Sequence, residues 1–171
     1  ATDTYNTAVG MLAGENVTTG IRNTLIGGLS GDAITEGNYN VGVGYQTLTS
    51  DVLGTGNTAV GYSALRDQSF STATDSYNTG LGYQAGTAIS TGTLNTLVGG
   101  LAGDALTTGF NNVAVGTSAL GSEDTGRYNV AIGKGALAVQ NSDADNYNTA
   151  VGYEAGNSVT TGTKNNFIGG L

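Results

Sequence analysis

The sequence predicts an all-β fold, a parallel β-solenoid of about ten coils with a 17-residue period. Asn recurs along the 171-residue chain, and four residues after each of these Asn residues stands a Gly that is preceded by Val, Ile or Leu. The numbers of successive repeat Asn differ by 17, 17, 17, 21, 17, 17, 17, 19 and 17. A short period kept along a whole chain is typical of stacked, similar units rather than of a globular core.

We therefore expect residues 1–171 to form a single β-solenoid segment, a β-roll or β-helix cut from a longer fibre. Each coil is counted from its repeat Asn as position 1, so coils 1 to 10 begin at Asn6, Asn23, Asn40, Asn57, Asn78, Asn95, Asn112, Asn129, Asn148 and Asn165. Val, Ile and Thr favour strands, whereas Gly and Asn favour turns. Each coil is expected to contain two short strands joined by two turns.

The composition excludes several classes of function. The chain has no Cys and no His, which removes thiol catalysis, Cys-based zinc sites and the usual general base. Its net charge of −8 is unsuited to nucleic acid or to an anionic membrane surface. No apolar run approaches the roughly 20 residues that cross a membrane, so no membrane insertion is expected. We predict no catalytic residue, no cofactor and no enzymatic activity.

The interior is predicted from positions that vary together. Where position 9 is Gly, position 12 is aliphatic, and where position 9 is Leu in a 17-residue coil, position 12 is acidic. With the aliphatic position 4 pointing inward, strand alternation sends positions 3 and 5 outward. An exposed apolar strip of this kind marks an interface between chains, here Leu25, Leu29, Leu97, Leu101, Phe167 and Leu171. The alternative is the reverse alternation, which places these residues in the core.

Two coils carry insertions, and the pattern as a whole repeats every four coils. The insertions span residues 66–76 and 138–146. In the second, Asn141, Asp143 and Asp145 match the start of a calcium loop, but the following Gly and the distal Glu are missing. We therefore assign no metal site and keep these three residues as weak candidates in a solvated loop. Deletion of residues 143–146 is expected to leave the core intact.

Two columns of side chains have both a binding and a structural interpretation. The repeated Asn could bind sugars or ions, but ten copies favour a ladder of amides that bonds coil to coil. Tyr45, Tyr62 and Tyr83 share position 6, as does Tyr153. They form either a platform for glycans or an aromatic stack that stabilises neighbouring coils.

Two further patterns bear on activity. The neighbouring Glu123 and Asp124 suggest glycoside hydrolysis, which needs two carboxylates facing each other in a cleft. We expect them instead to be turn residues. Thr pairs at positions 13 and 14 resemble an ice-binding array, but Glu36, Asp124 and the pair at 52–53 interrupt it.

The repeat also resembles known fibre proteins. Residues 57–65, Asn-Thr-Ala-Val-Gly-Tyr-Ser-Ala-Leu, and residues 129–137, Asn-Val-Ala-Ile-Gly-Lys-Gly-Ala-Leu, resemble the head repeats of trimeric autotransporter adhesins. They are equally similar to the collar and shaft repeats of phage tail fibres. The resemblance covers every coil and implies a parallel β-roll that trimerises along its length at a surface. Adhesin head repeats are shorter than the repeat of this chain, so the cross-section here differs.

These observations predict a structural shaft or head segment of a surface adhesin or phage tail fibre. Such a segment presents a receptor-binding tip, contacts surface glycans, and lies outside the cell or on a virion. We expect a homotrimer with end-to-end contacts to flanking fibre segments. The alternative is a monomeric solenoid that binds ice or a polysaccharide. The pattern leaves open the handedness and whether the source is a phage or a bacterium.

Overall fold

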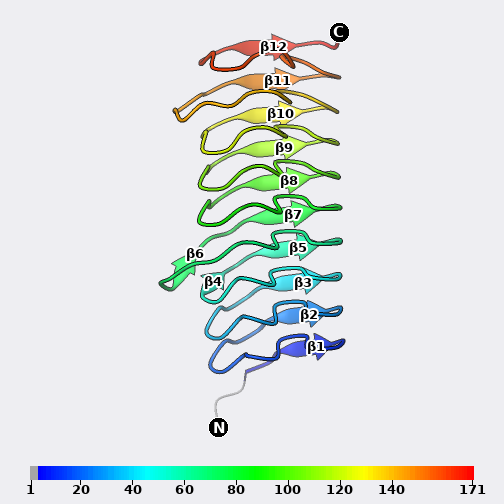
Figure 1. Ribbon diagram of the computed structural model, residues 1–171, viewed down its shortest axis with the longest axis vertical. Coiled ribbons are helices and arrows are strands. Elements are labelled where there is room, and N and C mark those ends of the chain that lie inside the picture. The colour runs from blue at the N-terminus through cyan, green and yellow to red at the C-terminus, as the bar shows by residue number, and fades with distance from the viewer. Residues whose placement is uncertain (1–3) are drawn as a thin grey trace.

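The structure, a computed structural model, describes residues 4–171 and confirms a parallel β-solenoid with the expected 17-residue period. Ten strands stack in chain order into one parallel sheet along the rod (Figure 1). They are β1 (Thr7–Val9), β2 (Thr24–Ile26), β3 (Val41–Val43), β5 (Thr58–Val60), β7 (Thr79–Leu81), β8 (Thr96–Val98), β9 (Val113–Val115), β10 (Val130–Ile132), β11 (Thr149–Val151) and β12 (Asn166–Ile168).

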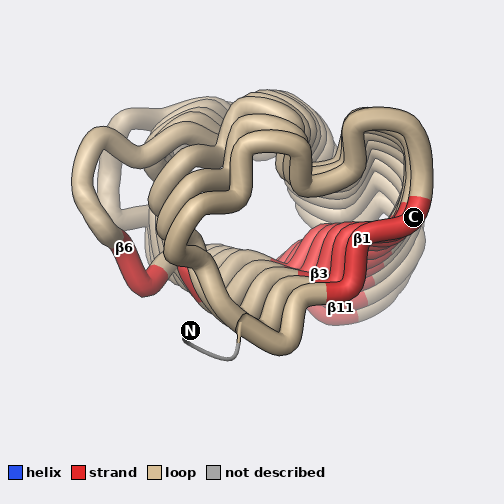
Figure 2. The backbone as a smooth tube through the Cα atoms, turned by 90° about the horizontal axis from the view of Figure 1, so that it is seen from below, coloured by secondary structure: helices blue, strands red, loops and turns tan. Residues whose placement is uncertain are grey.

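The return side of each coil is built from turns, not from the expected second strand (Figure 2). Positions 5, 7 and 9 adopt positive φ in coil after coil, for example Gly27, Leu29 and Gly31 at 130°, 57° and 57°. Alternating left-handed residues cannot continue an extended strand. The exception is a small parallel pair, β4 (Gly54–Thr55) with β6 (Thr74–Asp75), formed where the first insertion lies beside coil 3.

Equal positions of successive coils are hydrogen-bonded neighbours. Thr7, Ala8 and Val9 pair with Thr24, Leu25 and Ile26, and the same register continues to β12. The bonding extends around the turns, where Leu29 N donates to Met11 O at 2.9 Å. Every position of the repeat therefore becomes a column of side chains along the rod.

The repeat Asn residues form a continuous hydrogen-bonded ladder. Each Oδ1 accepts the backbone N–H of the next repeat Asn, at distances of 2.8 to 3.4 Å. In seven coils the Nδ2 group also donates across the coil to the carbonyl of the Gly at position 15. The eight Asn of coils 2 to 9 are completely buried, so the ladder stands where water cannot replace it.

The inward Asn fixes the alternation of the strand, and the predicted alternation is wrong. With position 1 inward, position 3 points inward and positions 2 and 4 point outward. Leu25 and Leu97 at position 3 are 1% and 0% exposed, whereas Leu81 at position 4 is 45% exposed. The core therefore contains the column that we expected to be an interface, and the aliphatic column expected in the core faces outward.

Three columns share the interior volume of each coil. Where positions 3 and 12 are large, position 9 must be Gly: a Cβ on Gly31 would lie 2.7 Å from Leu25 and 2.9 Å from Ile34. Where position 9 is Leu, position 3 is Gly or Ala and position 12 is polar. The leucines at position 9 of coils 3, 4, 7 and 8 are completely buried. They adopt φ values of 49° to 54°, a left-handed conformation that costs a non-Gly residue roughly 1–2 kcal/mol.

Candidate functional site

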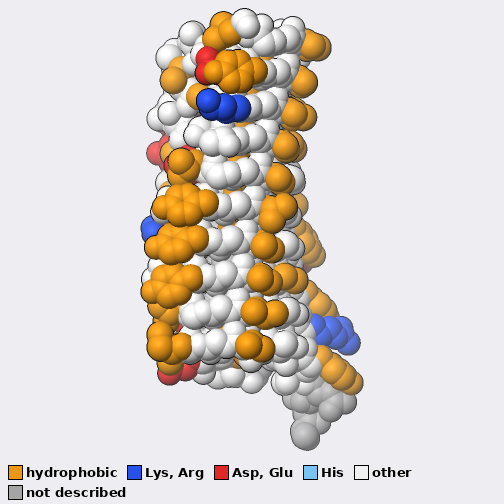
Figure 3. Space-filling model, turned by 90° about the vertical axis from the view of Figure 1, so that its right-hand side faces the viewer, with side chains coloured by type: hydrophobic (Ala, Val, Ile, Leu, Met, Phe, Trp, Pro, Cys, Tyr) orange, Lys and Arg blue, Asp and Glu red, His pale blue; other side chains and the backbone are white. Residues whose placement is uncertain are grey.

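The strands present an apolar outer surface, here called the sheet face, made of positions 2 and 4 of the ten coils. Position 4 is aliphatic without exception and position 2 is Thr, Val or one Asn, so the face carries no charge. Its position-4 side chains are exposed or half-buried, namely Val9, Ile26, Val43, Val60, Leu81, Val98, Val115, Ile132, Val151 and Ile168. In the view of Figure 3 hydrophobic side chains gather in two columns along the rod.

None of the six predicted interface residues lies on the sheet face. Leu25 and Leu97 are core residues, and Phe167 at the same position is half-buried against the core. Leu29 and Leu101, at position 7, are half-buried, and Leu171 is exposed at the same position of coil 10. Position 7 belongs to the turn after the strand, beyond the Gly of position 5. The exposed apolar strip exists, but it runs one residue further along each strand than expected.

Three tyrosines form an aromatic column on the turn that follows the sheet face. The ring centroids of Tyr45 and Tyr62 are 5.8 Å apart, and those of Tyr62 and Tyr83 are 5.4 Å apart, with both pairs stacked. Their side chains remain 45%, 46% and 55% exposed. The rings thus stack coil to coil, as the structural interpretation requires, and also remain accessible to a ligand.

A second aromatic group lies at the opposite end of the strand, on residues one or two places before the repeat Asn. Tyr128 and Tyr147 stack at 4.8 Å, and Phe110 meets Tyr128 edge-on at 5.5 Å. The guanidinium of Arg127 lies 5.0 Å from the Phe110 ring. Phe110 and Tyr128 are half-buried beneath these contacts and are less suited to ligand binding than the column at position 6, whereas Tyr147 remains 47% exposed.

A buried polar cluster surrounds Asp51 in coils 3 and 4. The carboxylate accepts hydrogen bonds from Gly54 N at 2.9 Å, Gln68 Nε2 at 2.6 Å and Asn57 Nδ2 at 3.4 Å. Burial raises the pKa of Asp51 to about 6, although the bonds from Gln68 and Gly54 act in the opposite direction. The cluster anchors the first insertion, because Ser76 at its end bonds Asn57.

An equivalent cluster surrounds Glu123 in coils 7 and 8, a role that its prediction as a turn residue did not include. Glu123 is completely buried and accepts bonds from Gly126 N at 2.8 Å, Gln140 Nε2 at 2.7 Å and Asn146 Nδ2 at 2.8 Å. The neighbouring Asp124 accepts from the Thr107 hydroxyl. The two carboxylates are held by separate donors and do not face each other across a cleft, as glycoside hydrolysis would require.

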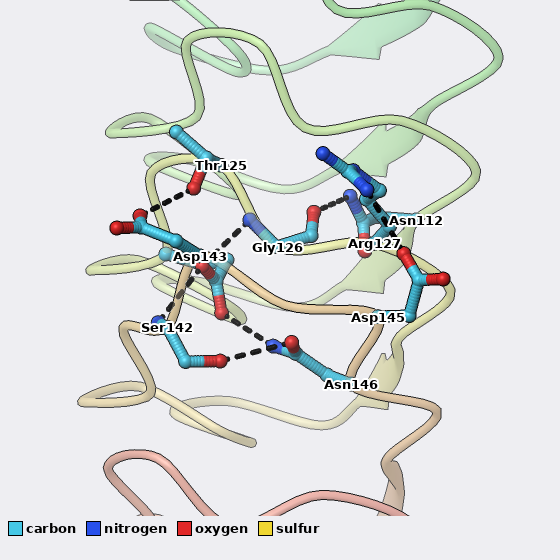
Figure 4. Close-up of polar contacts among 9 residues, drawn as sticks. Asn112, Thr125, Gly126, Arg127, Ser142, Asp143, Asp145 and Asn146 are labelled. Atoms are coloured by element: carbon cyan, nitrogen blue, oxygen red, sulfur yellow. Dashed lines mark hydrogen bonds and ion pairs between the residues drawn. The ribbon is translucent and has the colours of Figure 1, made fainter.

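The second insertion does not bring its acidic residues together. Asp143 accepts from Thr125 Oγ1 at 2.6 Å, whereas Asp145 forms an ion pair with Arg127 at 3.0 Å (Figure 4). Asn141 is exposed. Within residues 4–171 no group of three or more acidic side chains converges as a metal site would.

The Thr residues at position 13 serve the fold. The hydroxyls of Thr18 and Thr35 donate to backbone carbonyls of the next coil, at 3.1 and 3.4 Å. In contrast, six of the ten position-2 residues are Thr, and their hydroxyls form no hydrogen bond among the described residues. Free Thr hydroxyls therefore also lie on the sheet face, a location that the sequence patterns at positions 13 and 14 did not indicate.

The polar clusters around Asp51 and Glu123 were not predicted from the sequence, although a spacing in the sequence indicates them. Gln68 lies one 17-residue repeat after Asp51, and Gln140 lies one 17-residue repeat after Glu123, so each acid and its amide partner share one column. An amide stacked next to an inward acid is the pairing that burial demands.

Comparison with protein-family models, with curated proteins and with solved structures gives no match. The resemblance to adhesin and tail-fibre repeats thus rests on the motif residues alone. Over the described part of the chain, no helix is long and apolar enough to cross a membrane.

Proposed function

We propose that this chain is a structural rod of a fibrous surface protein, and that three copies associate through their sheet faces. The observation that carries the proposal is the unbroken aliphatic column at position 4, which one chain alone leaves in water. Soluble monomers rarely expose apolar surface over such a length, and an uncharged surface of this kind is typical of an interface.

The proposed role is mechanical presentation, without catalysis. The ladder of Asn, the parallel sheet and the intercoil bonds of the turns all run along the rod axis. Such a rod is a spacer that carries a receptor-binding tip and meets flanking fibre segments end to end. A phage tail fibre or a bacterial adhesin, outside the cell or on a virion, fits this role, in agreement with the motif resemblance.

Light scattering after size-exclusion chromatography tests the proposed association. We expect a mass three times the 17.0 kDa of one chain. Val98→Lys, in the middle of the sheet face, should yield single chains at the same concentration because a lysine at a dry contact loses its hydration. Thr91→Lys, an exposed return-side position, adds the same charge and should leave the mass unchanged.

A single-chain mass for the native protein, or a native mass for Val98→Lys, would contradict the proposed trimer. The first result favours a second candidate function, an ice-binding solenoid, which is motivated by the free Thr hydroxyls and aliphatic groups arranged in register on the sheet face. Thermal hysteresis that is lost in Thr79→Lys would support that candidate, and its absence would remove it.

A further inference from the structure

We propose that the C-terminal end of the aromatic column, at Tyr83 and Gly100, is a binding site for a pyranose ring of a neutral glycan. The inference extends the proposed role by adding a ligand class, and it rests on that role only in that a surface fibre meets glycans. The site lies on the turn after the sheet face, so it does not depend on association of the chains.

The rings of the aromatic column lean toward the N-terminal coil. A Cβ built on Gly28, at position 6 of coil 2, would lie 3.3 Å from the Tyr45 ring, which shows that this ring covers coil 2. Tyr62 then stacks on Tyr45, and Tyr83 stacks on Tyr62. Position 6 of coil 6 is Gly100 and position 6 of coil 7 is Thr117, so no ring covers Tyr83 from the C-terminal side. Tyr83 is accordingly the most exposed of the three rings.

Gly100 is unlike every other glycine of the described residues. Each of the others has positive φ or would bring a Cβ within 3.3 Å of another atom. Gly100 has neither property, because its Cβ would meet only Tyr83 O at 3.9 Å. Neither backbone conformation nor packing accounts for a glycine here. A glycine without such a cause is typical of a place where a ligand approaches the backbone.

The missing side chain leaves a notch beside Tyr83, since a Cβ on Gly100 would meet only Tyr83 O, at 3.9 Å. Adjacent parallel strands are about 4.8 Å apart, so a ring stacked on Tyr83 would lie at the level of coil 6, above Gly100. Thr117 holds the same position in coil 7, the next coil beyond Gly100, and Gln84 follows Tyr83 in the chain. The side chains of Gln84 and Thr117 form no hydrogen bond within residues 4–171 and are partly exposed, so both can bond a ligand.

The chemistry of the notch selects a sugar. A pyranose ring has an apolar C–H face that packs on an aromatic ring and equatorial hydroxyls that bond amides and hydroxyls at its edge. The chain carries 13 acidic and 5 basic residues, so its field repels sulfated or uronic glycans. The occupant is therefore a neutral hexose or N-acetylhexosamine chain.

Calorimetric titration with cellohexaose, chitohexaose and a heparin hexasaccharide tests this site. We expect binding of at least one neutral hexaose and none of the heparin fragment. Tyr83→Leu should bind about tenfold more weakly because it loses the aromatic contact. Gly100→Thr should lose binding by a comparable factor while keeping the native melting temperature, since Thr occupies the same position in coil 7. Tyr128→Leu, in the other aromatic group, is the matched control and should bind normally.

Native affinity in both Tyr83→Leu and Gly100→Thr, or no binding of either neutral hexaose, would overturn the proposed site. Preferential binding of the heparin fragment would overturn the assigned ligand class. Light scattering of the same samples reports the mass separately, so failure of the glycan site and failure of the trimer are distinguishable.

Discussion

On the strand side of each coil, position 1 is Asn, position 4 is aliphatic and position 5 is Gly throughout the rod, whereas the return side alternates between two solutions. Coils 1, 2, 5, 6 and 9 have Gly at position 9 and an aliphatic residue at position 12, while coils 3, 4, 7 and 8 have Leu at position 9 and an acid or Gln at position 12. Both solutions fill the same interior, as the complete burial of Ile34, Leu48 and Gln68 shows.

The difference separates two kinds of constraint. On the strand side every coil must match the next, because ladder bonds and backbone contacts join equal positions. On the return side only the total volume and the hydrogen bonding of buried polar groups must be satisfied. The coils with polar interiors are the two that carry an insertion and the two directly before them, and residues of each insertion bond a buried acid.

Gly99→Ala should have the largest effect, because it breaks the strand side. Gly99 has a φ of 132°, and its Cβ would lie 2.7 Å from the Gly116 backbone. We expect a loss in the free energy of unfolding on the order of 4 kcal/mol. The neighbouring Gly100→Ala is the control and should change it by less than about 1 kcal/mol. Equal denaturation midpoints for the two variants would show that the close contact between the backbones of Gly99 and Gly116 does not exclude a side chain at position 99.

Asn95→Ala should cost about 3 kcal/mol, because it leaves the Asn112 N–H and the Gly109 carbonyl without their side-chain partner. The exposed Asn141→Ala serves as control and should be nearly neutral. Urea denaturation measures both. A cost no greater than that of the control would mean that the ladder adds little to stability.

The pH dependence of stability should reveal the buried acid of the return side. The pKa of Asp51 is about 6 in the folded protein and 3.8 for the ordinary side chain, so the folded state binds the proton more tightly. The tighter proton binding of the folded state adds to the free energy of unfolding. This addition is fully present below pH 3.8 and is lost as the pH rises through about 6. Between pH 4 and 7 it amounts to about 3 kcal/mol at most. Chemical denaturation should show this slope in the native protein and a smaller one in Asp51→Asn.

The two insertions should tolerate changes at their tips but not at their anchors. Deleting residues 71–73, which are exposed, should cost less than about 1 kcal/mol. Asn146→Ala should cost about 2 kcal/mol, because it removes a buried donor from Glu123. Thermal unfolding compares the two variants. Because Asn146 is such an anchor, we now expect deletion of residues 143–146 to weaken the core rather than to leave it intact.

The period of Asn and Gly was enough to predict the solenoid, since ten copies in register are compatible with few folds. The prediction of which strand positions point inward was wrong. The aliphatic residues at position 4 resemble core residues, but the buried Asn at position 1 sets the alternation. An inward Asn places Leu25 in the core. The left-handed conformation of leucines such as Leu48 could not be predicted from the sequence. Its reason appears only in the structure, where Leu48 shares the interior of its coil with Gly42 and Asp51.

Thiol labelling of single-cysteine variants tests the sheet face most directly, since the chain has no cysteine of its own. Leu97→Cys should remain protected at every protein concentration, because position 97 is buried within the coil. Val98→Cys should react freely when the protein is dilute and become protected as the mass rises to three chains. Free reaction of Leu97→Cys, or reaction of Val98→Cys that ignores concentration, would contradict the account.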